Sequence, residues 1–244
     1  TAIRKLNSDL PDKAVEEAIR KLTAVDLSRS IAQHNQEYHG WLRDGVPIKY
    51  RNDDGETVSA NVQVIDFRRP DKNRFLAVRE LKIQGCRVPH YNRRADLVCF
   101  VNGLPLVFIE LKAVYKDVRQ GYDGNISDYM DTISEAFHHN AFIVVSNGEK
   151  ARYGSVTSLW EHFAEWKRND EAESGSLDAR TLLQGLLARD RLLDMVENFV
   201  LFDASKAGGV RKIVARNHQV LGVNRAVRSM MGQEELKKRY PPEK

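Results

Sequence analysis

Three charged side chains interrupt the most apolar stretch of this sequence. Asp96 opens a first apolar run, while Glu110 and Lys112 close a second one. Charged groups are rarely placed in buried strands unless they are paired or bind an ion. Asn102-Gly103 joins the two runs and predicts a two-strand hairpin, because both residue types tolerate positive φ. With Gly103 at the centre of the hairpin, Asp96 lies opposite Glu110, and Glu110 and Lys112 face the same side.

Such a group is suited to metal-assisted hydrolysis of phosphodiester bonds. Two carboxylates within ~5 Å of each other repel unless a cation lies between them. Mg²⁺ prefers oxygen ligands and keeps several waters, and the backbone carbonyl of Leu111 could be a third ligand. A lysine beside the metal can hold or deprotonate an attacking water and neutralise charge building on a phosphate. An ordinary salt-bridge cluster at a strand end is the alternative, and burial and spacing alone leave it open.

A second triplet, Asp66, Glu80 and Lys82, repeats the same spacing. Its flanking segments are more polar, and its centre falls in the charged stretch 68–74. An exposed hairpin with ordinary surface charges explains this second triplet. We therefore favour the triplet at 96, 110 and 112 as the site.

The elements around the triplet predict an α/β fold. Two helical segments come first, five strand-like segments follow, and then a helix and a further strand. This order favours a mixed β-sheet flanked by helices. The segments after residue 177 have no strand partners, so we expect a domain at 1–170 and a C-terminal helical connector at 171–244. The strands are expected at 46–50, 62–67, 75–83, 95–101, 104–111 and 141–146, and the later helices at 116–139, 160–166, 177–189, 191–200 and 213–227.

The stretch from Arg94 to Lys112 resembles the nuclease core of the restriction (R) subunit of type I restriction–modification enzymes, within the PD-(D/E)xK nuclease superfamily. That family's pattern is R-x-D-L-V-x-F-V-N-G-x-P-L-x-x-x-E-x-K, and every element of it stands here. The resemblance continues through residues 42–46, 140–148, 163–167 and 192–202. It implies a restriction-endonuclease-like fold and a DNA endonuclease that uses Mg²⁺, with Mn²⁺ as a substitute. Asp96 and Glu110 would be metal ligands, and Lys112 the catalytic lysine.

Related nucleases carry a Q-x-x-x-Y element on the helix after this core. The matching helix here offers Asn125-x-x-x-Tyr129, with Asn in place of Gln, so Tyr129 carries over as a catalytic residue. Gln120 lies nearby but has no Tyr four residues later. Packing of Tyr129 against the sheet is the alternative role.

The resemblance also implies partners and a second cofactor. Residues 212–219 are similar to the segment before the ATP-dependent translocase of these subunits, where a glutamine reads adenine, and Gln219 is the matching position. No G-x-x-x-x-G-K-[ST] loop occurs, so we expect an N-terminal fragment that needs motor domains to use ATP. In the family, modification and specificity subunits supply sequence recognition, and translocation leads to cutting of double-stranded DNA at non-specific sites.

Contacts with DNA should then go to backbone phosphates. The formal net charge of +4 and the pI near 9.0 permit such a polyanionic partner without requiring it. Solvated surface charge is the alternative role for each cation. Six cations are expected near the active end of the sheet: Arg93, Arg94, Lys116, Arg119, Lys150 and Arg152.

The sequence gives weaker indications of the cellular compartment and leaves two alternatives to the type I nuclease function. Two isolated cysteines, no leader-like segment and no long apolar stretch indicate a cytoplasmic protein without a membrane partner. One rival function is the nuclease domain of another ATP-dependent restriction system. The other is a module that docks on DNA or on the motor without cutting, which the intact triplet disfavours.

Overall fold

The structure is a computed structural model that describes residues 1–86, 92–205 and 208–239. Its centre is a five-stranded sheet in the order β3-β4-β5-β6-β7, in which β5 and β6 are parallel and the other neighbours are antiparallel. These strands are β3 (Phe75–Gln84), β4 (Asn92–Val101), β5 (Leu104–Leu111), β6 (Phe142–Ser146) and β7 (Ala151–Gly154). The expected mixed α/β fold is confirmed.

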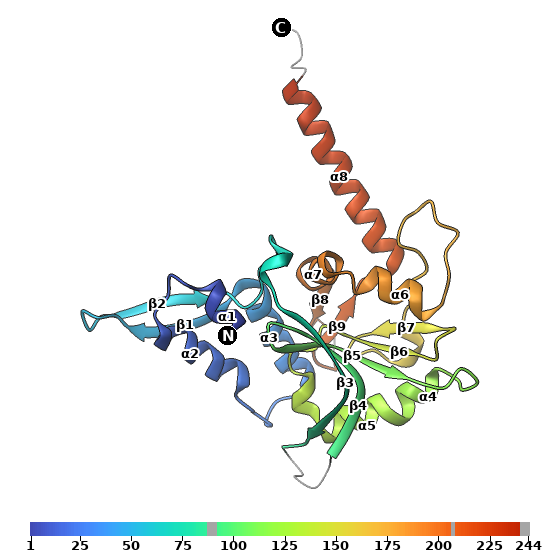
Figure 1. Cartoon of the computed structure of the whole chain (residues 1–244), viewed down its shortest axis with the longest axis horizontal. Helices are drawn as coiled ribbons and strands as arrows, with labels where there is room; N and C mark the ends of the chain where they lie inside the picture. Colours follow the sequence, from blue (N-terminus) through green and yellow to red (C-terminus); the bar gives the residue numbers. More distant parts are fainter. Residues whose placement is uncertain (87–91, 206–207, 240–244) are drawn as a thin grey trace.

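The remaining elements surround this sheet (Figure 1). Two smaller antiparallel pairs are β1 (Val46–Arg51) with β2 (Thr57–Val62), and β8 (Val200–Asp203) with β9 (Arg211–Val214). The α-helices are α1 (Ala2–Leu6), α2 (Asp12–Thr23), α3 (Ile31–Asp44), α4 (Arg119–Gly121), α5 (Ser127–Thr132), α6 (Ala179–Leu186), α7 (Arg189–Asn198) and α8 (Asn217–Arg239). A π-helical turn spans Tyr122–Ile126, and short 3₁₀ turns span Pro70–Lys72, Ser134–Phe137 and Trp160–His162.

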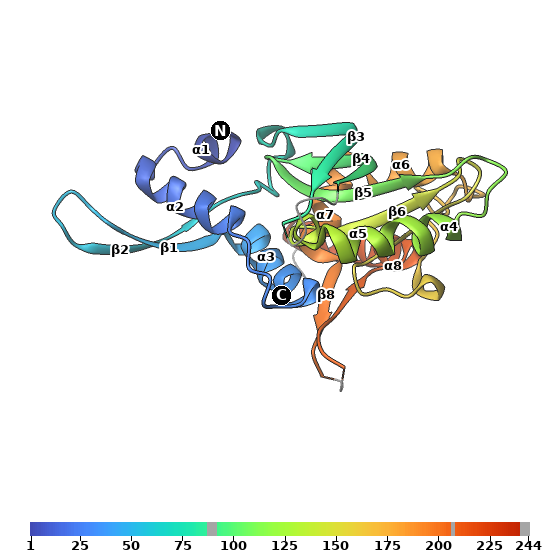
Figure 2. The same cartoon turned by 90° about the horizontal axis from the view of Figure 1, so that it is seen from below.

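Helical segments cover both faces of the sheet. On one face, residues of β5 and β6 pack with Ile126, Ile133 and Phe137 of the segment that contains α4 and α5. On the other face, further residues of β5 and β6 share a core with Leu182 of α6 and Leu193 of α7. Figure 2 shows α5 and α4 on one side of the sheet and α6 on the other. The central strands are therefore covered on both sides, which explains why they are apolar at nearly every position.

The strand directions bring four strand ends together. The amino end of β4, the carboxyl ends of β5 and β6 and the amino end of β7 lie at the same end of the sheet. Asp96 stands near the start of β4, and Glu110 near the end of β5. Asp96 and Glu110 therefore lie at the same end of the sheet.

The hairpin between β4 and β5 contains a register shift. Asn102 and Gly103 form its two-residue turn with φ of 53° and 93°, which fits the primed turns that hairpins prefer. Val101 pairs with Leu104, but the register shifts by one residue before Cys99 pairs with Val107. The turn is therefore centred between Asn102 and Gly103, not on Gly103 as expected.

Leu106 is the extra residue of this irregular ladder. Phe100 pairs with Pro105 and Cys99 with Val107, so Leu106 has no partner on β4. Its carbonyl instead accepts the N–H of Ala141 at 2.7 Å, immediately before β6. A bulge of this kind moves the rest of the strand by one position. Because of this shift, Asp96 faces Glu110 immediately beyond the pair of Leu97 and Ile109.

Two expected elements differ from the structure. Residues 62–67 do not form a strand that pairs with β3; β2 ends at Val62 and pairs with β1 instead. Val64, Ile65 and Asp66 are buried in an irregular segment, which explains their strand-like composition. Residues 160–166 form a single 3₁₀ turn and an extended segment rather than a helix.

The C-terminal region is not purely helical. The segment expected as a helix at 213–227 begins with β9, which pairs with β8, before α8 starts at Asn217. The division into 1–170 and 171–244 stays a prediction; α6 and α7 share the core of β5 and β6. None of the helices in the described ranges combines the length and the apolar character that crossing a bilayer requires.

Candidate active site

Glu110 is the most deeply buried charged residue of the favoured triplet. Its side chain lies near the end of β5, with 1% of the residue exposed. Its neighbour on β6 is Val145, which belongs to the core beneath α5. Oε1 accepts a hydrogen bond from Lys112 Nζ at 2.7 Å. A buried carboxylate with a charged partner fits the expectation that these charges act together.

Asp96 is held beside Glu110 by the hairpin backbone. The observed pairing reaches Leu97 opposite Ile109, so Asp96 and Glu110 are the next facing positions. Asp96 Oδ2 accepts the backbone N–H of Leu111 at 2.8 Å. Asp96 is only half-buried, so the carboxylate borders the solvent while Glu110 does not.

The segment after β5 completes the group. Lys112 Nζ donates to Asn125 Oδ1 at 2.9 Å as well as to Glu110. Asn125 Nδ2 lies 3.4 Å from the hydroxyl of Tyr129, one helical turn further along. That hydroxyl donates to the backbone carbonyl of Arg94 at 2.8 Å, with Glu110 Oε2 3.3 Å away. Two strands and one helix therefore meet in one hydrogen-bonded network.

A glycine allows the helix to approach this closely. A Cβ atom on Gly121 would lie 2.5 Å from Val145 Cγ1, 3.4 Å from Glu110 Cγ and 3.5 Å from Lys112 Cε. Val145 is fully buried and has no room to move. Gly121 precedes the π-helical turn that carries Asn125, and such turns are frequent at functional sites. The close contact sets the distance between Asn125 and Lys112.

Burial dominates the electrostatics of the site. Removal from water raises the pKa of Glu110; the hydrogen bond from Lys112 opposes this rise, and the charge of Asp96 adds to it. Burial also raises the pKa of Tyr129 to about 12, so its hydroxyl keeps its proton at neutral pH. The effect of Asp96 on Glu110 means that the two carboxylates repel each other. A cation between them would relieve this repulsion.

The donor set fits a hard divalent cation. Asp96 and Glu110 supply carboxylate oxygens, and the Leu111 carbonyl lies on the same strand end. Within the described ranges, no cluster of three or more His, Cys, Asp or Glu side chains is placed to hold a metal ion. Mg²⁺ is suited to such a sparse set, because it commonly binds one or two carboxylates and keeps waters. The residues present therefore fit Mg²⁺ better than a metal that needs His or Cys ligands.

The six cations expected near this end have different environments. Arg93 is ion-paired with Asp128, Arg94 lies 3.6 Å from Glu80, and Arg119 lies 2.9 Å from Asp123. Lys116 is exposed in the connection between β5 and α4, and Lys150 is exposed in the turn before β7. All six positions are at the expected end of the sheet. Their contacts with DNA stay a prediction.

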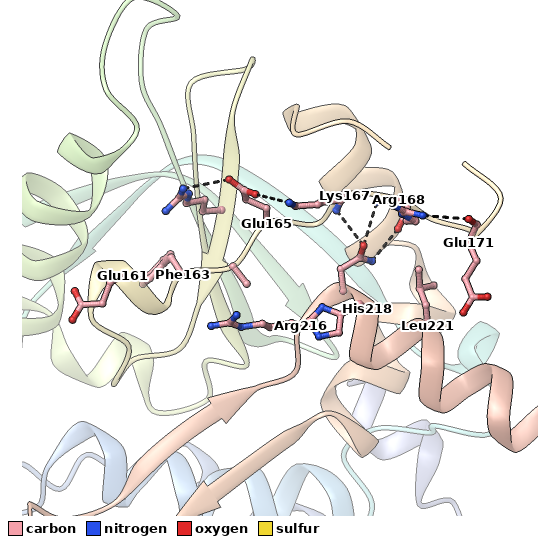
Figure 3. A pocket seen from close by; sticks show the side chains of 12 residues that line it. Glu161, Phe163, Glu165, Lys167, Arg168, Glu171, Arg216, His218 and Leu221 are labelled. Atoms are coloured by element: carbon pink, nitrogen blue, oxygen red, sulfur yellow. Dashed lines mark hydrogen bonds and ion pairs between the residues drawn. The ribbon is translucent and has the colours of Figure 1, made fainter. Parts of the chain in front are cut away.

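Arg152 lines a separate pocket of about 640 Å³ (Figure 3). Its guanidinium is 3.3 Å from Glu165 Oε1, and Lys167 approaches the same carboxylate at 3.5 Å. Arg216 and His218, at the start of α8, line the opposite part of the pocket. No member of the favoured triplet lines this pocket. It is therefore a feature distinct from the candidate active site.

The second triplet does not assemble. Asp66 is buried in the loop before β3, where it accepts the N–H groups of Arg68 and Arg69 and pairs with the Arg69 side chain at 2.8 Å. Glu80 and Lys82 are exposed on β3. The expected explanation, surface charges on an exposed hairpin, holds for Glu80 and Lys82 but is wrong for Asp66. That carboxylate instead holds a buried loop together.

Asn125, at the site, and Gln219, at the start of α8, carry only weak sequence signals. Asn125 replaces the Gln of the related motif, yet its carboxamide contacts both Lys112 and Tyr129. Its spacing of four residues from Tyr129 on a helix is the signal that identifies it. Gln219 lies in the first turn of α8, where its Oε1 accepts the backbone N–H of Arg216 at 2.8 Å. Its expected role with ATP is not tested by this contact.

Comparison with known proteins identifies a family and several relatives of this chain. Residues 1–162 match the family described as Type I restriction enzyme R protein N terminus (HSDR_N). The HindI endonuclease subunit, a type I restriction enzyme of Haemophilus influenzae, is 36% identical over 240 residues, which cover 93% of this chain and 22% of that protein. The putative MjaIXP endonuclease subunit of Methanocaldococcus jannaschii is 26% identical over 250 residues, covering 93% of this chain and 23% of that protein.

A third relative, the EcoprrI endonuclease subunit of Escherichia coli, is 25% identical over 250 residues, covering 92% of this chain and 75% of that protein. The chain spans less than a quarter of the length of the first two relatives. The matched region contains the whole candidate site, from Asp96 to Tyr129. The chain belongs to the family of type I restriction enzyme R protein N termini.

Proposed function

We propose that this chain is a metal-dependent endonuclease domain that hydrolyses phosphodiester bonds of DNA. The observation that carries the proposal is the hydrogen-bonded group of Glu110, Lys112 and Asn125 beside Asp96. A purely structural ion pair would need one acid and one base. Here a second carboxylate adds to the repulsion on Glu110, which favours a site that takes a cation.

Each side chain has a distinct role in this proposal. Asp96 and Glu110, with the Leu111 carbonyl, would hold Mg²⁺, which supplies Lewis-acid charge to phosphate oxygens when bound; Mn²⁺ would substitute for it. Lys112 has three N–H donors and uses two of them on Glu110 and Asn125. The third is available to orient an attacking water or to neutralise charge on the phosphate. Asn125 and Tyr129 position Lys112 and Glu110.

The proposed substrate is double-stranded DNA, bound through its phosphates. The expected cations lie at the same end of the sheet as the triplet, on strand ends, on the adjoining loops or, for Arg119, at the start of α4. Phosphate contacts do not read bases, so they suit cutting without sequence preference. The six cations of this proposal are Arg93, Arg94, Lys116, Arg119, Lys150 and Arg152.

The relatives named as type I restriction enzyme endonuclease subunits suggest the larger assembly. We extend the proposal to a complex with modification and specificity subunits in the cytoplasm. Cutting would follow translocation along DNA that is driven by ATP in further domains of the longer subunit. Gln219 would contact nucleotide only in that full-length protein.

Nicking of supercoiled plasmid by the chain in Mg²⁺ or Mn²⁺ tests the proposal. Asp96→Ala and Lys112→Ala should abolish nicking, because each removes a member of the site. Lys82→Ala is the matched control, since Lys82 has the same place in the second triplet. Calorimetric titration with Mg²⁺ should show weaker binding for Asp96→Ala and unchanged binding for Lys82→Ala. Equal nicking by the wild type and Lys112→Ala, alone and in the assembled enzyme, would refute the hydrolase function.

A further inference from the structure

Large apolar side chains are exposed where the chain leaves the candidate active site. The connection between β5 and α4 follows Lys112 and contains Val114, which is 55% exposed, and Tyr115, which is 83% exposed. Leu111, at the end of β5, is 48% exposed. Figures 1 and 2 both show this connection projecting beyond the end of the sheet. We call residues 111–118 the β5–α4 loop.

Hydrogen bonds fix the shape of the β5–α4 loop. The N–H of Lys116 donates to the Ala113 carbonyl at 2.8 Å, which closes a turn with Tyr115 near its tip. Asn147 Nδ2, from the turn after β6, donates to the carbonyls of Val114 at 3.1 Å and Lys116 at 2.9 Å. These bonds fix the backbone on either side of Tyr115, so the loop presents this aromatic side chain to solvent from a defined place. An aromatic side chain presented in this way is typical of a binding surface.

The place of Tyr115, in the connection that follows the proposed catalytic Lys112, favours DNA as the partner. Lys116 is its neighbour in the chain, and Lys150 lies in the turn that Asn147 begins; each of these cations stands beside an exposed acid, Asp117 or Glu149. Among the salt bridges of the described residues, none involves Lys116 or Lys150. Cations beside an exposed aromatic ring suit nucleic acid, because the cations bind phosphates and the ring packs against a sugar or inserts between base steps in a groove.

We propose that Tyr115 is the tip of a DNA-contacting loop that packs against bases or sugars next to the phosphate that is cut. Lys116 and Lys150 bind the phosphates on either side. The inference rests on the proposed nuclease function and adds to it the element that places the duplex. Contacts with sugars and phosphates do not read the bases, so this loop does not require a recognition sequence.

Binding of fluorescein-labelled duplex DNA to the chain, followed by anisotropy in EDTA, tests the inference without cleavage. Tyr115→Ala should weaken binding by roughly 10-fold, the loss expected when one contacting aromatic side chain of an interface is truncated. Tyr115→Trp should bind as the wild type does. Leu201→Ala is the control, because Leu201 on β8 is 65% exposed and apolar but lies outside the loop. Ultraviolet cross-linking to duplex containing iododeoxyuridine should give an adduct on Tyr115.

The outcomes separate this inference from the nuclease proposal. Lys112→Ala should lose nicking while it keeps most of its affinity for DNA, whereas Tyr115→Ala should lose affinity and still cut at saturating DNA. Equal affinity of Tyr115→Ala and wild type, or adducts only elsewhere, would overturn the inference and leave the nuclease proposal standing. Unchanged DNA affinity with weaker assembly onto the modification and specificity subunits would overturn it too, and would make the loop a protein-docking surface. Absence of duplex binding by the wild type would also overturn it.

Discussion

Two triplets of Asp, Glu and Lys share one spacing in this chain and have different fates. The triplet of Asp96, Glu110 and Lys112 lies on the central hairpin, where pairing across the strands and a covering helix bring the three together. The members of the other triplet are separated: Asp66 is in a buried loop, while its Glu and Lys are exposed on β3. Spacing alone is therefore not the signal. The signal is spacing within a hairpin whose two strands are covered on both faces.

The backbone at the two glutamates shows the same difference. Glu110 is in a regular ladder position, paired with Val145 on β6. Glu80 has a φ of 50°, and the pairing of β3 with β4 passes over it between Arg79 and Leu81. A non-glycine residue in this conformation is strained by roughly 1–2 kcal/mol. The pairing between β3 and β4 is therefore interrupted at Glu80, which is the position across from Asp96.

The largest expected effect is a difference in nicking rate between variants of Glu110 and Glu80. Glu110→Gln should lower the rate of plasmid nicking by at least about 100-fold, because it removes the charge that would hold the cation. Glu80→Gln should change the rate by less than about two-fold, because Glu80 is exposed and its ion pair is with Arg94 rather than with a member of the favoured triplet. Initial nicking rates in Mg²⁺ check both values. Comparable losses in the two variants would mean that both triplets contribute to one site.

The next effect concerns the helix that covers only the first triplet. Gly121→Ala should destabilise the chain by about 2 kcal/mol, because its Cβ would overlap the buried Val145 side chain. The matched control is Gly124→Ala, since a Cβ there meets nothing within 4 Å. Alanine should stabilise that helical position by up to about 1 kcal/mol. Urea unfolding of both variants measures the difference, and similar stabilities would show that the helix does not sit this tightly on the sheet.

Substitution of Asp66 tests whether this residue of the second triplet stabilises the buried loop rather than takes part in cleavage. Asp66→Ala should destabilise the chain by about 1–2 kcal/mol, because it leaves the N–H groups of Arg68 and Arg69 without their buried acceptor. The nicking rate of the folded variant should match the wild type. Thermal unfolding and nicking at a temperature well below the transition check the two expectations. Loss of nicking without loss of stability would instead assign Asp66 to the chemistry.

The smallest effect tests the strain at Glu80. Glu80→Gly should stabilise the chain by about 1 kcal/mol, since glycine adopts positive φ without steric cost. Arg79→Gly is the control, because Arg79 is paired in the strand and should lose stability on the same substitution. Chemical denaturation gives both values. Destabilisation by Glu80→Gly would mean that the contact of Glu80 with Arg94 outweighs the backbone strain.

Much of the site follows from residues near each other in sequence. The Asn102-Gly103 turn and the apolar runs beside it predict a hairpin with Asp96 opposite Glu110, and the observed ladder leads to the same facing positions. The reason is partly different, because the turn has two residues and the bulge at Leu106 adds the missing step. Hydrophobic pattern specifies which face a residue takes. It does not show where an extra residue is inserted.

Elements that depend on contacts between separate segments cannot be predicted from local sequence patterns. Val64 and Ile65 have a strand-like composition but are buried without pairing, and β8 pairs with β9 although their segments were expected to be helical. The contact of Asn125 with Lys112 depends on a π-helical turn and on a glycine that lets the helix approach β6. None of these has a periodic signal in the sequence.

Patterns in the sequence are sufficient to predict the family, the mixed α/β class and the three charged residues at the open end of the central hairpin. These follow from local turn chemistry and from alternation along single strands, which act over a few residues. Three features follow only from the folded chain: Asn125 contacts Lys112, Asp66 holds a buried loop together, and Tyr115 projects from a hydrogen-bonded loop. The contacts of Asn125 and of the loop that carries Tyr115 join separate segments of the chain. The contacts of Asp66 are local, but its burial, like the other two features, is set by the whole fold rather than by neighbours in sequence.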